Sequence, residues 1–142
     1  MPKKVGILYH PRLEMARTLA EKLKEVVQQH KGQAWLSSAW GEEEARSLMP
    51  GTDLVLSLGG DGTILRAARS VIPKPIPILG INLGRLGFLT ELSANEAVES
   101  LPSFLDGGGW VEDRAMLQIE ILSPGKKPGE VDSYYALNDV VA

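Results

Sequence analysis

The sequence contains no cysteine and only two histidines, His10 and His30. Without cysteine there is no disulfide framework, no thiolate nucleophile and no cysteine-ligated zinc, and two histidines are too few for a histidine-rich metal site. The 18 acidic residues outnumber the 15 basic ones, for a net charge of -3, so the basic footprint of a nucleic-acid or membrane-surface protein is missing. No apolar run approaches a membrane span or a signal-peptide core. We expect a cytoplasmic protein that binds small molecules, with neither nucleic acid nor membrane as a partner.

The chain has 142 residues, of which 44% are hydrophobic and 23% charged. These values are close to the averages of folded proteins and exclude disorder or a coiled coil as a description of the whole chain. The length is that of about one ordinary domain, large enough to bury a core.

Short apolar runs alternate with amphipathic segments from residue 5 to about 105, a pattern that predicts an α/β fold with a parallel sheet. Pro77 suggests an edge or bulged strand, and Pro102 is expected to kink its helix or end it early. Ser93 and Glu96 have the spacing of a capping box. The expected strands are 5–9, 34–36, 53–58 and 76–81, and the expected helices are 12–30, 42–49, 64–72 and 93–105.

The pattern changes near residue 110. Residues 117–122 alternate in polarity, a turn-rich segment follows, and a second β-like run covers 134–141, which together predict an antiparallel hairpin. We expect an α/β domain over 1–110 and, over 111–142, the start of a β domain whose remainder lies beyond this sequence. Such a fragment is expected to be poorly active or inactive by itself.

The strongest motif, Gly59-Gly60-Asp61-Gly62-Thr63, joins a predicted strand to a predicted helix. Ligands of open α/β sheets bind at the carboxyl ends of the strands, and a helix N-terminus attracts phosphate. A carboxylate would repel phosphate, so Asp61 is better suited to a hydroxyl or a metal ion, the arrangement needed to transfer a phosphoryl group to an alcohol. The structural alternative is a tight turn with positive φ and a capping aspartate. The P-loop and dinucleotide-binding motifs are absent.

Two further segments are candidates for the site. Residues 80–91 follow a predicted strand and combine glycines with Asn82, Arg85 and Phe88, which suits the lining of a nucleotide pocket or an ordinary loop. Asn138 and Asp139 are neighbouring polar residues in an apolar β run, where one side chain could face a ligand; a strand end or a bulge explains them equally well.

The segments LGGDGTILRAAR, GINLGRLGFLTEL, EDRAMLQIEI and ALNDVVA, in this order, resemble NAD kinase over almost the whole chain. The resemblance implies a Rossmann-like, phosphofructokinase-like α/β domain followed by a C-terminal β-sandwich. It also implies transfer of a phosphoryl group from ATP or polyphosphate, with a divalent metal ion such as Mg²⁺, to the 2′-hydroxyl of the adenosine ribose of NAD. A homo-oligomer is expected for the full-length protein.

Site residues also follow from the resemblance. Asp61 matches the family's proton acceptor, Gly62 its NAD-binding neighbour, and Phe88 an aromatic residue near the adenine. Asn138 and Asp139 match the family's Asn-Glu/Asp pair, which contacts the same ribose region. Arg66 is a weaker candidate contact. The complete set of expected cofactor-binding residues is Gly59, Gly60, Asp61, Gly62, Thr63, Arg66, Asn82, Phe88, Asn138 and Asp139.

Two alternatives remain open from the sequence. The glycine motif also resembles that of lipid kinases and phosphofructokinases, so a related kinase acting on a lipid or sugar alcohol is one alternative. A nucleotide-sensing module without catalysis is the other.

Overall fold

A computed structural model describes residues 2, 4–85, 87–122, 124–125, 127 and 132–137. The chain divides into two compact units, Met1–Val111 and Glu112–Ala142. Among the described residues, no helix is both long and apolar enough to cross a membrane.

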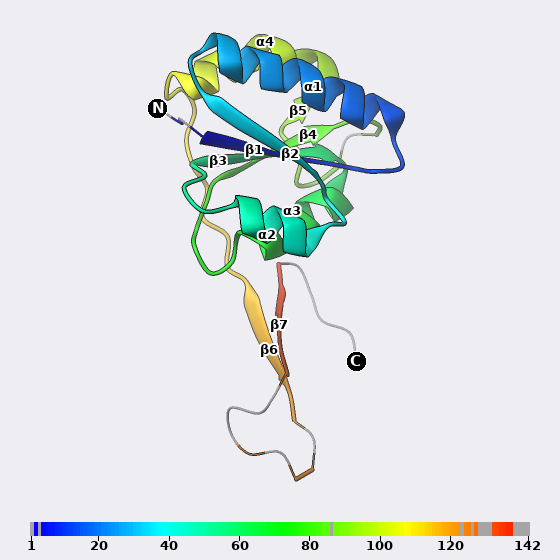
Figure 1. The fold of residues 1–142 in the computed structure, drawn as a ribbon. Helices are drawn as coiled ribbons and strands as arrows, with labels where there is room; N and C mark the ends of the chain where they lie inside the picture. Colours follow the sequence, from blue (N-terminus) through cyan, green and yellow to red (C-terminus); the bar gives the residue numbers. More distant parts are fainter. Residues whose placement is uncertain are drawn as a thin grey trace. The chain divides into compact units, whose positions relative to one another are not determined.

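The first unit is built on a five-stranded parallel sheet (Figure 1). Its strands lie in the order β2-β1-β3-β4-β5, and the predicted parallel α/β fold is confirmed. The short β5 was not predicted, because two residues carry no readable pattern. The bounds are β1 Lys4–Tyr9, β2 Gln33–Ser38, β3 Leu54–Gly59, β4 Ile78–Asn82 and β5 Leu92–Ser93.

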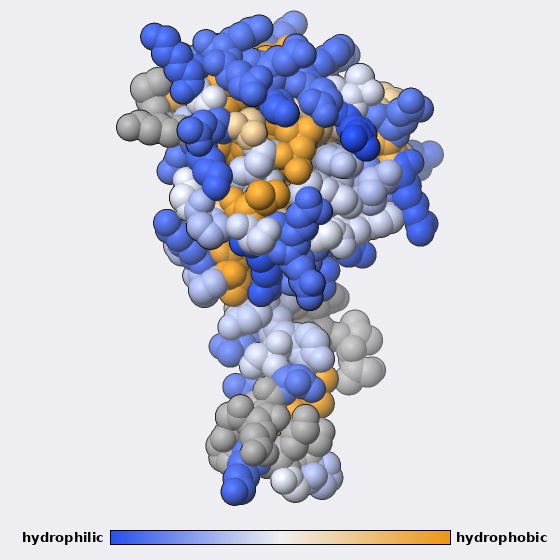
Figure 2. All heavy atoms as spheres, viewed as in Figure 1, coloured by the Kyte–Doolittle hydropathy of each residue, from blue (hydrophilic) through white to orange (hydrophobic). Residues whose placement is uncertain are grey.

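Two helices cover each face of this sheet (Figure 1). Helices α1 (Glu14–Gln29) and α4 (Ala94–Leu105) cover one face, and α2 (Glu42–Leu48) and α3 (Asp61–Val71) cover the other. Two apolar clusters correspond to these layers, one joining α1 and α4 to the sheet and the other joining α2 and α3 to it. Figure 2 shows hydrophilic side chains over the outer surface of α1, as expected of an amphipathic helix whose apolar side packs on a sheet.

The strand β3 lies in the middle of the sheet and is buried along its whole length. Its sequence, LVLSLG, is the nearly continuous apolar run typical of a strand covered on both faces. The glycine motif therefore begins at the end of a rigid, central element.

Two details differ from the sequence-based expectations. The helix α3 begins at Asp61 instead of Ile64, so Asp61 and Gly62 belong to its first turn. Pro102 lies inside α4 without ending it, because Leu101 and Leu105 on either side are held in the core. The expected edge position of Pro77 agrees with the structure: it immediately precedes β4, which pairs with β3 along its whole length but with β5 only at Ile81 and Asn82.

The second unit contains the predicted antiparallel hairpin. Its strands are β6 (Leu117–Ile121) and β7 (Asp132–Ala136), with Ile119 opposite Tyr134. Asn138 and Asp139 lie outside the described residues. The assignment of this unit to a β-sandwich stays a prediction.

Candidate active site

The strand order places a topological switch point between β1 and β3. The chain leaves β1 towards α1 and β2 on one side, and leaves β3 towards α3 and β4 on the other. In open α/β sheets the connections diverge at such a point and leave a crevice at the carboxyl ends of the strands, where ligands bind. Here His10 follows β1 directly, and the glycine turn follows β3 directly.

The three glycines of the turn have different surroundings. A Cβ atom on Gly59 would collide with Oγ1 of Thr63 and come within 3.3 Å of Cβ of His10, so packing requires glycine there. A Cβ on Gly60 or Gly62 would have no described atom within 4 Å. Neither has a positive φ, so the tight left-handed turn considered above is not formed. A ligand that approaches the backbone would explain both glycines.

The first turn of α3 carries an uncapped helix N-terminus. The amides of Thr63 and Ile64 donate to the carbonyl oxygen of Gly60 at 3.1 and 3.3 Å, and no side chain caps the helix. The amides of Asp61 and Gly62 are thus left for solvent or a ligand, at the positive end of the helix dipole. The side chain of Thr63, predicted as a binding residue, is only 3% exposed and lies beneath the turn.

The carboxylate of Asp61 holds the loop that follows β4. Its Oδ2 accepts a hydrogen bond from the amide of Phe88, and its Oδ1 accepts one from the amide of Leu89, each at 3.0 Å. A Cβ on Gly87 would collide with Oδ1 of Asp61, so this approach depends on glycine at position 87. A carboxylate has about four lone-pair positions, so Asp61 keeps acceptor capacity for a substrate hydroxyl.

The ring of Phe88 is 99% exposed although its backbone amide is fixed on Asp61. A single exposed aromatic ring needs no explanation on its own, but this ring is anchored next to the only carboxylate of the glycine motif. It therefore presents a flat apolar surface on which a ligand ring can stack.

Asn82, another predicted binding residue, shapes the same loop. Its side chain is 6% exposed, its Nδ2 donates to the carbonyl oxygen of Gly84, and its Oδ1 accepts from the amide of Gly84, both at 3.2 Å. Asn82 is also paired with Gly59 across β4 and β3. The structure thus brings the two glycine-containing segments together, while the predicted contact of Asn82 with a cofactor stays a prediction.

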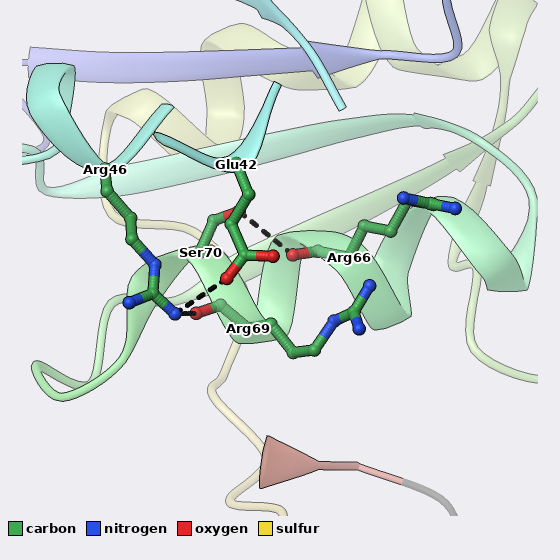
Figure 3. Close-up of polar contacts among 5 residues, drawn as sticks. All are labelled: Glu42, Arg46, Arg66, Arg69 and Ser70. Atoms are coloured by element: carbon green, nitrogen blue, oxygen red, sulfur yellow. Dashed lines mark hydrogen bonds and ion pairs between the residues drawn. The ribbon is translucent and has the colours of Figure 1, made fainter. Parts of the chain in front are cut away.

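Arg66 and Arg69 extend from α3 in the same direction, away from Arg46 (Figure 3). Arg46 pairs with Glu42 at 2.8 Å and donates to the carbonyl oxygen of Arg69 at 3.0 Å, which ties α2 to the end of α3. Arg66 points into the region of β1 and β2 instead, where its guanidinium lies 5.1 Å from the ring centroid of Trp40.

Three residues join the site that were not predicted from the sequence. His10 and Arg12 follow β1, and Trp40 follows β2; the rings of His10 and Trp40 lie 4.8 Å apart, and Arg12 lies 4.9 Å from the Trp40 ring centroid. These residues could have been predicted from their positions shortly after two parallel strands, because the carboxyl ends of parallel strands lie at the same edge of a sheet.

Comparison with known proteins agrees with this geometry. The family model for the ATP-NAD kinase N-terminal domain matches residues 3–109. An NAD kinase of Dehalococcoides mccartyi is 40% identical over 141 residues, which are 99% of this chain and 49% of that protein. The chain belongs to the NAD kinase family. An NAD kinase of Magnetococcus marinus is 51% identical over 92 residues, or 65% of this chain and 29% of that one. The chain spans about half the length of the Dehalococcoides relative.

Two solved structures share the fold of this chain. Yeast NADH kinase, complexed with NADH, has a TM-score of 0.71 and 20% identity over 97% of this chain and 48% of its own. An NAD kinase from Archaeoglobus fulgidus, in complex with ATP, has a TM-score of 0.55 and 23% identity, and the match covers 90% of this chain and 45% of that protein. At this level of identity the likeness concerns the fold alone.

Proposed function

We propose that the complete protein containing this chain is an NAD kinase, which transfers a phosphoryl group from ATP or polyphosphate to the 2′-hydroxyl of the adenosine ribose of NAD. The observation that carries the proposal is the position of Asp61, a carboxylate with spare acceptor capacity in the first turn of α3. Membership of the family supports the same reaction.

In this proposal Asp61 acts on the acceptor. It accepts the proton of the 2′-hydroxyl as the oxygen attacks the terminal phosphorus, and the bond between that phosphorus and its bridging oxygen breaks, so ADP leaves with the electron pair. The exposed ring of Phe88, anchored on Asp61, is suited to stack on the adenine of NAD. NADH bound to the yeast relative and ATP bound to the Archaeoglobus relative are consistent with these substrates.

The donor would lie against the backbone of the glycine turn. Gly60 and Gly62 leave open space, and the uncapped N-terminus of α3 favours negative charge. Phosphoryl transfer depends mainly on positioning and on electrostatic stabilisation of the phosphoryl oxygens, which amides of this kind provide.

Magnesium enters this proposal as part of the substrate MgATP. The described residues contain no group of three or more His, Asp or Glu side chains able to hold a metal. Mg²⁺ at phosphoryl-transfer sites is commonly held by substrate phosphates with one or two carboxylates, and Asp61 is the carboxylate available at the turn. A cytoplasmic location, a homo-oligomer, and ribose contacts from Asn138 and Asp139 belong to the proposal on the family resemblance alone.

The test is NADP formation from NAD, ATP and Mg²⁺ by the complete protein, followed with an NADP-specific dehydrogenase. We expect product from the natural sequence and little from Asp61→Asn. Lipid and sugar alcohols serve as competing acceptors, and phosphorylation of one of them in place of NAD would assign another substrate class. Binding of NAD or ATP without transfer to any acceptor would identify a sensor.

A further inference from the structure

We propose that Arg12, Trp40 and Arg66 form a binding site for the polyphosphate chain of the phosphoryl donor, next to the glycine turn. This inference rests on the proposed function for the identity of the donor and deepens it by locating the phosphates that are not transferred. The shared ligand chemistry is a linear chain of phosphates, supplied by a nucleoside triphosphate or by inorganic polyphosphate.

Three separate elements bring the site together. Arg12 lies in the connection after β1, Trp40 in the connection after β2, and Arg66 in α3. The guanidinium carbons of Arg12 and Arg66 lie 4.9 and 5.1 Å from the centroid of the same Trp40 ring, within the range of cation–π contacts. Two positive charges from distant parts of the sequence are therefore both held at one exposed ring.

These two charges have no acidic partner among the described residues. Of the acidic residues in α2, Glu42 pairs with Arg46. Glu44 lies near Gly41, since a Cβ atom added to Gly41 would be 3.6 Å from Oε2 of Glu44. Two positive charges at one ring with no carboxylate beside them favour a negatively charged ligand that can reach both guanidiniums. The cluster is built for a negatively charged ligand.

His10 connects this cluster to the glycine turn. Its ring lies 4.8 Å from that of Trp40, and its backbone amide donates to the carbonyl oxygen of Leu58 at 2.9 Å. Nδ1 of His10 accepts a hydrogen bond from the amide of Arg12 at 3.2 Å, so in the neutral ring the proton is on Nε2, which can donate to an anion. Because Cβ of His10 also lies close to Gly59, one ligand can reach both the cluster and the turn.

A chain of phosphates fits these groups better than other anions or a base. Each guanidinium presents a planar fork of donors that matches phosphate oxygens, and two forks can engage two phosphates of one chain. Trp40 already contacts both guanidiniums, so stacking of an adenine on it would have to displace one of them.

Binding is tested first, independently of catalysis. Calorimetric titration of the 142-residue chain with inorganic tripolyphosphate compares the natural sequence with Arg12→Gln and with the control Lys22→Gln. Lys22 lies on the exposed side of α1, about 12 Å along the helix from its first residue, and loses the same charge. We expect Arg12→Gln to weaken binding about tenfold, as for a lost charge-assisted hydrogen bond, and Lys22→Gln to have little effect. Equal affinity of the natural chain and Arg12→Gln overturns the proposal.

Trp40 is tested with Trp40→Leu, with far-UV circular dichroism to establish that the variant is folded. Since the ring holds both arginines, its loss should weaken tripolyphosphate binding even though no charge is removed. Arg12→Lys keeps the charge without the planar fork and should fall between Arg12→Gln and the natural chain. If a folded Trp40→Leu variant binds tripolyphosphate as tightly as the natural chain does, the ring has no role in binding.

Kinetics of the complete protein then identify the source of the chain. Arg12→Gln should raise KM for the donor about tenfold while KM for NAD stays close to that of Lys22→Gln. If KM rises only for ATP, the nucleotide is the natural occupant of the site. If KM rises only for polyphosphate, the inorganic chain is the occupant. If KM rises only for NAD, the proposal is overturned, because the site would then bind the acceptor. Tripolyphosphate binding that depends on Arg12 in a protein without NADP formation would refute the proposed function and leave this site standing.

Discussion

Asp61 and Phe88, 27 positions apart in the sequence, are joined by a hydrogen bond of 3.0 Å from the amide of Phe88 to Oδ2 of Asp61. The bond fixes the backbone of Phe88, whose ring is fully exposed, next to the proposed proton acceptor. One carboxylate therefore has two tasks, to accept a proton and to hold a loop, and the two must be separated experimentally.

Asp61→Asn should reduce kcat in the complete protein by about 10²- to 10⁴-fold, or roughly 3 to 5 kcal/mol of barrier, because it removes the general base. The asparagine oxygen can still accept one of the two amide bonds, so part of the loop's anchorage remains. Initial rates of NADP formation give kcat, and the amide resonances of Phe88 and Leu89 report on the loop. Near-natural turnover with a displaced loop would assign Asp61 a purely structural role.

Gly87→Ala tests the loop without removing the carboxylate. The new Cβ would collide with Oδ1 of Asp61, so either the loop or the carboxylate must move, and we expect a loss of kcat together with altered NAD affinity. Gly84→Ala, in the same loop, is the matched control because its Cβ would meet no described atom within 4 Å. Equal kinetics for the two variants would show that the contact between Asp61 and Gly87 is dispensable.

Gly59 and Gly62 should respond in opposite ways to alanine. Gly59→Ala forces a collision with Thr63 and should lower the free energy of unfolding by about 1–3 kcal/mol. Gly62 lies in the first turn of α3, where alanine meets no described atom, so Gly62→Ala should stabilise the protein by up to about 1 kcal/mol while weakening nucleotide binding. Urea unfolding and calorimetric titration with ATP measure the two effects, and undiminished ATP affinity in Gly62→Ala would contradict the proposed approach of a ligand to this backbone.

Phe88→Ala should leave stability within about 0.5 kcal/mol of the natural protein, because the ring is exposed, while raising KM for NAD. Phe88→Tyr keeps a stacking surface and should restore KM. Trp110→Ala removes another exposed ring, 92% accessible, from a different segment and serves as the control. If Phe88→Ala and Trp110→Ala leave KM equally unchanged, the ring does not contact NAD.

The capping box of α4 gives a prediction for pH. The amide of Ser93 donates to Oε2 of Glu96 at 2.9 Å, and this bond, followed by the one involving the Ser93 side chain, lowers the pKa of Glu96 below its ordinary value of 4.5. A lowered folded-state pKa means that the contribution to stability is present above the unfolded-state value and is lost as pH falls through the folded-state value. The difference in unfolding free energy between the natural chain and Glu96→Gln should therefore shrink as pH falls below 4.5.

Ser93→Ala provides the control for that measurement. It removes one of the two hydrogen bonds and should raise the pKa of Glu96 partly towards its ordinary value, as followed by NMR titration. Loss of the cap should also lower stability by about 1 kcal/mol. A pKa of Glu96 that is the same in Ser93→Ala and in the natural chain would show that the hydroxyl does not contribute.

Periodicity and local chemistry were enough to predict most of the fold. The alternation of apolar runs with amphipathic segments predicts parallel strands and helices that cover both faces, because only burial on two faces explains a run such as Leu54–Gly59. The capping box of Ser93 and Glu96 was readable because both its hydrogen bonds lie within three residues. The glycine motif was placed at the end of a strand for the same local reason.

Tertiary structure decided what these local patterns could not. Pro102 remains within α4 because Leu101 and Leu105 are buried, and this packing outweighs the local preference of proline to end a helix. The bond between Asp61 and Phe88, and the meeting of Arg12 with Trp40, join residues separated by many positions, so neither has a signature in sequence spacing. The sequence alone determined which elements form and which residues can carry the chemistry. The order of the strands determined which of these residues meet, because it fixes which carboxyl ends lie side by side.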